Sequence, residues 1–152
     1  MEVFQISSDI KKGNMQYWGR ELGMCWQRLV YAVFKSTRDK DFEHPKRYGS
    51  DEPYDLKVGE FVIDTKYRIG SGDAGTLKKF KTYGEMLKAE GLKPVILILR
   101  EDNLTQAVQA CRTGGWTIYI GDDAFDFILK ETNGFDLKNY LENSKGSRSI
   151  VI

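Results

Sequence analysis

Cysteine and histidine are scarce in this sequence. Its 152 residues include two cysteines, Cys25 and Cys111, and one histidine, His44. Two cysteines so far apart, each inside an apolar helical pattern, exclude a scaffold built on several disulfides. A single histidine with no cysteine nearby excludes an ordinary zinc site, so we expect His44 in a surface loop without a functional role. The low cysteine content fits a reducing compartment, and we predict a cytoplasmic protein.

Long apolar runs and excess charge of one sign are missing too. The longest strongly apolar run, residues 95–99, is far too short to cross a bilayer, and the first residues lack the pattern of a signal peptide. We therefore expect no membrane partner. The 23 basic and 22 acidic residues give a net charge of +1, so whole-molecule charge favours neither nucleic acid nor an anionic membrane.

The composition that remains is that of a folded globular protein. Apolar residues make up 41% of the chain and charged residues 30%, which argues against intrinsic disorder. The length favours one hydrophobic core over two. We predict a single domain over residues 1–142, followed by a polar, flexible tail over residues 143–152.

The first half of the sequence predicts a helix followed by a β-hairpin. Apolar residues recur at three-and-four spacing over residues 15–34, which indicates one long amphipathic helix. Residues 36–50 are rich in charge and predict a loop or an irregular edge strand. Two runs that favour β-structure, 54–58 and 61–69, flank Gly59, which suits the first position of a type II′ turn.

The second half alternates helices and strands. The expected elements are, in order, a helix over residues 76–90, a strand over 95–100, a helix from Asn103 to Cys111, a strand over 116–120 and a helix capped near Asp122. Right-handed crossovers place the two strands parallel to each other and beside the hairpin. The sequence therefore predicts an α/β fold with a mixed central sheet flanked by helices.

The hairpin brings two acidic residues together. With a two-residue loop, paired positions have numbers that sum to 119, so Asp55 faces Asp64. Side chains alternate between faces, so these two acids share one polar face with Lys66. The opposite, apolar face carries Leu56, Val58, Phe61 and Ile63. Like charges in directly opposed positions destabilise a sheet, so a protein normally avoids this pair.

A divalent cation turns that repulsion into binding. Mg²⁺ prefers oxygen ligands, commonly one or two carboxylates, and keeps several waters. Lys66 points to the same side, where an ammonium can stabilise charge that develops on a phosphate oxygen. The pattern therefore favours phosphodiester hydrolysis. The alternative is a solvated face on which the lysine offsets two acids.

Two short segments resemble the motif of the PD-(D/E)XK nucleases, of which type II restriction endonucleases are the best-known members. They are residues 53–55, Pro-Tyr-Asp, and residues 64–66, Asp-Thr-Lys, at the end of an apolar strand. The resemblance implies a restriction-endonuclease-like fold and a Mg²⁺-dependent endonuclease of double-stranded DNA, most simply a type II restriction enzyme. Because one compact site cuts one strand, we expect a homodimer.

The resemblance also assigns roles to individual residues. It implies that Asp55 and Asp64 bind Mg²⁺, for which Mn²⁺ substitutes, with help from the backbone carbonyl of Thr65. It makes Lys66 catalytic. Many members add a glutamate from the helix before the hairpin, and Glu21 is the matching candidate, although it also has the spacing to pair with Arg28 or to remain solvated.

The sequence departs from the family pattern in two places. Tyr54 interrupts the Pro-Asp pair, which leaves Asp51 as a rival first metal ligand. The additional strand that the family has before its first acid is not identifiable. A structure-selective nuclease, such as a Holliday-junction resolvase, shares the same motif and is the alternative enzyme.

Basic residues and glycines follow the hairpin. Residues that we expect to contact DNA phosphates are Arg68, Ser71, Lys78, Lys79 and Lys81. The lysines are equally compatible with a solvated helix face. Residues 70–75 match G-x-G-x-x-G between a strand and a helix, so a dinucleotide-binding module is the alternative of another class. Against it, Asp73 places negative charge where a pyrophosphate approaches.

Overall fold

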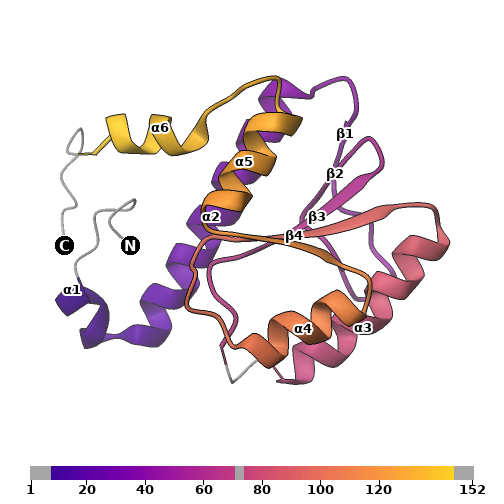
Figure 1. The fold of residues 1–152 in the computed structure, drawn as a ribbon, viewed down its shortest axis with the longest axis horizontal. Helices are drawn as coiled ribbons and strands as arrows, with labels where there is room; N and C mark the ends of the chain where they lie inside the picture. The colour runs from indigo at the N-terminus through magenta and orange to yellow at the C-terminus, as the bar shows by residue number, and fades with distance from the viewer. Residues whose placement is uncertain (1–7, 71–73, 146–152) are drawn as a thin grey trace.

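One mixed β-sheet with helices on both faces forms the centre of the protein (Figure 1). The computed structural model describes residues 8–70 and 74–145. The strands lie in the order β1-β2-β3-β4-β5. Their bounds are β1 Phe42–Glu43, β2 Leu56–Val58, β3 Phe61–Lys66, β4 Lys93–Ile98 and β5 Thr117–Ile120. The helices are α1 Ser8–Gly13, α2 Met15–Thr37, α3 Ala74–Ala89, α4 Thr105–Thr113, α5 Asp122–Glu131 and α6 Leu137–Asn143.

The predicted hairpin register is confirmed. In the antiparallel pair β2 and β3, Leu56 lies opposite Ile63 and Val58 lies opposite Phe61. Gly59 in the turn has a φ of 57°, a value that glycine adopts without the strain of a Cβ. Strands β3, β4 and β5 are parallel, as the alternating pattern predicts. The strand that precedes the first acid is β1, a two-residue edge strand paired with β2.

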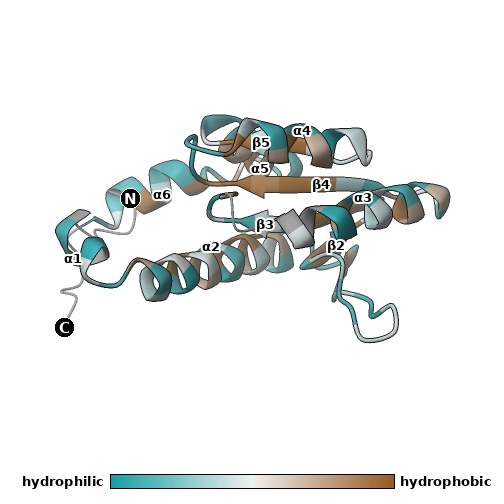
Figure 2. Ribbon diagram, turned by 90° about the horizontal axis from the view of Figure 1, so that it is seen from below, coloured by the Kyte–Doolittle hydropathy of each residue, from teal (hydrophilic) through white to brown (hydrophobic). Residues whose placement is uncertain are grey.

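The sheet separates two hydrophobic cores. Helices α2, α5 and α6 cover one face, where Trp26 of α2 packs with Ile63 and Leu97. Helices α3 and α4 cover the other face, where Phe80 packs with Val62. Figure 2 shows β4 as a hydrophobic strand and α2 as a helix that carries both hydrophobic and hydrophilic residues. Among the described helices, none has the length and apolar character needed to cross a membrane.

The expectation of a purely polar second face is wrong. Val62 is fully buried on the face that Asp64 shares, and Asp64 itself is only 5% exposed. The physical reason is that β3 lies inside a βαβ unit, and strands of such units are covered by helices on both sides. Asp64 therefore lies near the end of a buried strand rather than on an open surface. The prediction that Asp55 shares its face is wrong, because the Asp55 carboxylate contacts the Thr65 hydroxyl and Gln27 of α2, whereas Lys66 lies against Phe80 of α3.

Two details of the helical half differ from the expectation. Asn103 does not cap α4, which has Leu104 at its N-cap. The side-chain amide oxygen of Asn103 instead accepts a hydrogen bond from the backbone N–H of Ile69 at 2.8 Å, which holds the segment after β3 in place. The short helices α1 and α6 were not expected. Within the predicted tail, Asn143 ends α6, and residues 146–152 lie outside the described residues.

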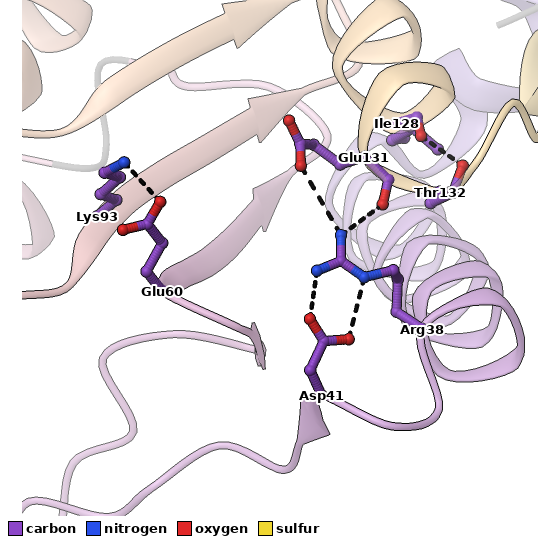
Figure 3. Close-up of polar contacts among 7 residues, drawn as sticks. All are labelled: Arg38, Asp41, Glu60, Lys93, Ile128, Glu131 and Thr132. Atoms are coloured by element: carbon purple, nitrogen blue, oxygen red, sulfur yellow. Dashed lines mark hydrogen bonds and ion pairs between the residues drawn. The ribbon is translucent and has the colours of Figure 1, made fainter.

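Arg38 at the end of α2 joins three segments (Figure 3). Its Nε donates to Asp41 at 3.0 Å, ahead of β1, and its guanidinium also donates to the backbone carbonyl of Glu131 at 2.8 Å. This carbonyl ends α5, so one side chain connects α2, the start of the sheet and α5. The connection fixes the far end of α2 and with it the register of the helix over the sheet.

Candidate active site

Asp64 and Lys66 form an ion pair at the carboxyl end of β3. Lys66 Nζ lies 3.0 Å from Asp64 Oδ2. Because the two residues are separated by one position in a strand, their side chains lie on the same face. The ammonium also lies 5.0 Å from the centre of the Phe80 ring on α3. The lysine is therefore held between a carboxylate and an aromatic face, while a third of its side chain stays exposed.

Burial gives Asp64 an unusual protonation equilibrium. Desolvation is the largest effect and raises the pKa of Asp64 to about 7, against the opposing charge of Lys66. The negative charge of Asp55 raises the pKa further. Within the described residues, the buried Oδ2 of Asp64 accepts no hydrogen bond of good geometry. Asp64 therefore offers an acceptor that a cation can use.

Asp55 lies directly before β2 and is held by three donors. Its Oδ2 accepts from the backbone N–H of Thr65 at 2.8 Å and from the Thr65 hydroxyl at 2.6 Å. Its Oδ1 accepts from Gln27 Nε2 at 2.7 Å. Burial raises the pKa of Asp55, and these hydrogen bonds from Thr65 oppose the rise. The carboxylate is fixed in orientation before any ligand arrives.

The backbone of Thr65 faces the same edge as Asp55. Asp55 donates its N–H to the carbonyl of Ile63 at 2.9 Å, although Ile63 is paired with Leu56, so the register shifts by one residue just before β2. Peptide groups alternate along a strand, so Thr65, two residues on, directs its N–H and its carbonyl to that same edge. The Thr65 carbonyl, which the family resemblance implies as a metal ligand, therefore faces the edge of the sheet at which Asp55 lies.

This donor set fits a magnesium ion. The described residues contain no group of three or more His, Cys, Asp or Glu side chains placed to hold a metal. Two carboxylates and one carbonyl are enough for Mg²⁺, because it keeps several waters of its own. The Oδ2 of Asp64, which is buried and accepts no well-formed hydrogen bond, is the observation that supports the fit.

The structure places Glu21 apart from this cluster. Its carboxylate lies 3.8 Å from Arg20 Nε, and 41% of the side chain is exposed. The residue of α2 that reaches Asp55 is Gln27. The two positions are roughly 120° apart around a helix of 3.6 residues per turn. Sequence reasoning missed Gln27 because a neutral amide contributes nothing to a charge pattern; its place beside the apolar stripe was the one available signal.

Asp51 has another partner. Its carboxylate accepts from the Tyr83 hydroxyl at 2.5 Å and lies 3.4 Å from Lys79 Nζ, both on α3. The Tyr83 hydrogen bond is the main reason that the pKa of Asp51 is lowered, and Lys79 adds to it. Asp51 thus ties the loop before Asp55 to α3. Of the two candidate first acids, Asp55 is the one that contacts the segment of Asp64, Thr65 and Lys66, through Thr65.

The residues expected to contact DNA are dispersed. Arg68 donates to the backbone carbonyl of Asp102 at 2.7 Å and lines a cleft beside Lys66. Lys78 and Lys81 are exposed on α3, across the sheet from α2. Lys79 shares α3 and pairs with Asp51, as described above. Ser71 lies outside the described residues, as do the other two central positions of the glycine-rich stretch, 72 and 73.

Comparisons with known proteins identify no relative of this chain. No family model matches it, and neither a curated protein nor a solved structure does so. Because one fold supports many chemistries, function is argued from the residues of the site.

Proposed function

We propose that this protein is a Mg²⁺-dependent endonuclease that hydrolyses phosphodiester bonds of DNA, with a restriction-endonuclease-like fold. The observation that carries the proposal is the ion pair of Asp64 and Lys66 at the end of β3, with Asp55 close enough to raise the pKa of Asp64. A purely structural pair gains nothing from a second buried acid beside it. A catalytic site does, because a bound cation offsets both charges.

Each residue of the site has its own role in the proposed hydrolysis. Asp55, Asp64 and the carbonyl of Thr65 would hold Mg²⁺, which polarises the phosphate and lowers the pKa of a bound water. Lys66 is the group positioned to stabilise the charge that builds on a phosphate oxygen. Its contacts with Asp64 and Phe80 restrict the ammonium before substrate binds. Thr65 and Gln27 keep the Asp55 carboxylate in one orientation.

A type II restriction enzyme acting as a homodimer is the specific form that we propose. One such site hydrolyses one strand, and a symmetric pair of sites is the simplest way to cut both. A structure-selective nuclease is the second candidate. It is favoured by a cleft of about 450 Å³ between α2 and the end of β3, which is too small for a duplex.

A nuclease assay with three cation conditions tests the function. Supercoiled plasmid and a branched synthetic duplex are incubated with the protein in Mg²⁺, in Ca²⁺ and in EDTA. We expect cleavage in Mg²⁺ and none in EDTA. Discrete plasmid bands support a restriction enzyme, and cutting of the branched substrate alone supports a structure-selective one. Intact substrates in Mg²⁺ would overturn the proposal.

A further inference from the structure

Two hollows lie side by side on the surface of α2. The first is the cleft of about 450 Å³, whose lining includes Gly23, Thr65 and Lys66. The second has a volume of about 340 Å³ and is lined by Met24, Gln27, Arg28 and Tyr31. Met24 and Gln27 line both hollows. The hollows therefore meet at the residue that donates to Asp55.

Their size suits single nucleotides. Both volumes are within the range of roughly 300–1,000 Å³ that is common for small-molecule sites. A double helix does not enter a hollow of this size, whereas one sugar and base do. Two adjacent hollows separated by Gln27 thus match two successive nucleotides, with the phosphate between them next to Asp55.

The charge along α2 suits a phosphate backbone. Glu21 is the only acidic residue of the helix, against Arg20, Arg28 and Lys35. Arg20 lines the first hollow and Arg28 lines the second. Arg28 is exposed, and the described part of the chain gives it no ion-pair partner. One cation therefore stands on each side of Gln27.

The walls of the hollows also suit sugars and bases. Met24, which lines both hollows, is 39% exposed, and Met15, which lines the first hollow alone, is 65% exposed. Thioether side chains adapt to varied apolar partners. In the first hollow, a Cβ added to Gly23 would meet no atom within 4 Å. Packing inside the chain therefore does not require glycine at this position.

From these contacts we infer that one unpaired nucleic-acid strand binds on the surface of α2, with its backbone at Gln27 and one nucleotide in each hollow. We call this binding surface the track. The inference rests on the proposed nuclease function and favours its second candidate, the structure-selective nuclease, because the substrate is then single-stranded or opened at the cleaved position. It also places the principal phosphate contacts on α2, on the sheet face opposite to α3 and its lysines.

Strand binding without metal tests the position of the track. A fluorescently labelled single-stranded oligonucleotide, alone or annealed to its complement, is titrated with the full-length protein in EDTA. We expect the single strand to bind more tightly than the duplex. Arg28→Ala should weaken it about three- to tenfold and reduce the salt slope by about 0.7, the value for one phosphate contact in a single strand. Arg112→Ala, an exposed arginine on α4, is the matched control and should bind as the wild type does.

Substitutions of Gly23 test the hollow itself. Gly23→Ala removes a helix-destabilising glycine and should raise the melting temperature by roughly 2–4 °C. Gly23→Leu should be at least as stable as wild type and bind the strand about tenfold more weakly, because its side chain fills the cleft. Loss of binding without loss of stability is not a structural effect.

The outcomes separate this inference from the proposed function. Strand binding with these variant effects, but no cleavage in Mg²⁺, supports the track and overturns the nuclease. Cleavage together with wild-type binding by Arg28→Ala and Gly23→Leu overturns the track alone. Tighter binding of the duplex, equal loss in Arg112→Ala, or no binding of the single strand by the wild type would also overturn the track.

Discussion

Thr65 donates both its backbone N–H and its hydroxyl to the same carboxylate oxygen of Asp55, at 2.8 and 2.6 Å. The residue between the second acid and the lysine therefore orients the first acid. This arrangement links the two strands of the hairpin at the point where both acids lie. The middle position of the Asp-Thr-Lys triplet is thus a positioning residue whose side chain matters, although the family resemblance assigns a role only to its carbonyl.

Replacing Thr65 by valine tests that role. Thr65→Val keeps the shape of the side chain and removes one of the three donors to Asp55. We expect about a tenfold lower cleavage rate at saturating Mg²⁺ and a loss of about 1 kcal/mol of unfolding free energy, the usual net value of one hydrogen bond. Thr82→Val on the exposed surface of α3 is the control and should change neither quantity. Unchanged cleavage by Thr65→Val would show that the backbone N–H and Gln27 are sufficient.

The second prediction concerns the lysine. Lys66→Ala should abolish cleavage and leave DNA binding nearly intact, because the ammonium acts on charge that develops in the transition state. Single-turnover cleavage and an equilibrium binding assay measure the two effects separately. Lys93→Ala, which removes a lysine paired with Glu60 near the hairpin turn, is the control. Wild-type cleavage by Lys66→Ala would remove Lys66 from the mechanism.

The fold was largely predictable because its signals are local. Apolar spacing along α2, the glycine turn after β2 and the alternation after residue 90 each report one element, and chirality then orders the strands. The short edge strand β1 was ambiguous because two residues carry no periodicity. Asn103 was misjudged because its side chain satisfies a distant backbone group, that of Ile69, rather than the helix next to it.

The candidate site was predictable in part. Register arithmetic predicts the pairs from Leu56 to Phe61 correctly, because pairing in a hairpin depends on the turn. It does not extend to Asp55, which precedes β2 and directs its carboxylate to Thr65 and Gln27. Burial of Asp64 was not predictable, since it depends on helices that pack over the sheet from later in the chain. The contact of Gln27 and the anchoring of Asp51 by Tyr83 join segments 28 and 32 residues apart, which no local pattern reports.

The third prediction distinguishes two basic surfaces. If the lysines of α3 contact phosphates, Lys78→Ala combined with Lys81→Ala should weaken binding of duplex DNA about equally for all sequences. The salt slope should then fall by roughly 0.9 for each phosphate that the variant no longer neutralises. Measurement of the dissociation constant at several salt concentrations gives the slope. An unchanged slope would assign both lysines to a solvated helix face and leave α2 as the binding surface.

The fourth prediction uses glycines as probes of packing. A Cβ on Gly84 of α3 would lie 2.1 Å from the backbone carbonyl oxygen of Gly114 and 2.8 Å from Trp116 Nε1. Gly84→Ala should therefore lower the free energy of unfolding by about 1–3 kcal/mol, the usual cost of overpacking, despite the better helix propensity of alanine. Gly23→Ala, in the open cleft, should instead raise the free energy of unfolding. Thermal or urea denaturation measures the change in unfolding free energy of both variants. A stabilised Gly84→Ala would contradict the close contact of α3 with the end of α4.

The fifth prediction tests the metal site by stability alone. The pKa of Asp64 is raised to about 7 in the folded protein, so between about pH 4 and pH 7 the fold binds a proton that the unfolded chain releases. Stability from this group is therefore present at low pH and is lost as the pH rises through 7. Asp64→Asn removes the buried charge, and at pH 8 the variant without metal should melt at the same temperature as wild type or higher. The difference should shrink as the pH falls toward 5, where the wild-type carboxyl is protonated.

Addition of metal should reverse the order. Wild type should gain stability with Mg²⁺ or Mn²⁺ by mass action, about 2.7 kcal/mol at a hundredfold excess over the dissociation constant, and Asp64→Asn should gain little. Asp55→Asn should also lose the gain, whereas Asp51→Asn should keep it, because Asp51 contacts Tyr83 and Lys79 instead. Two results together would make Asp64 a structural partner of Lys66: a melting temperature several degrees lower in Asp64→Asn, and a wild-type melting temperature that does not change when metal is added. The proposed hydrolysis would then have no metal ligand at its centre.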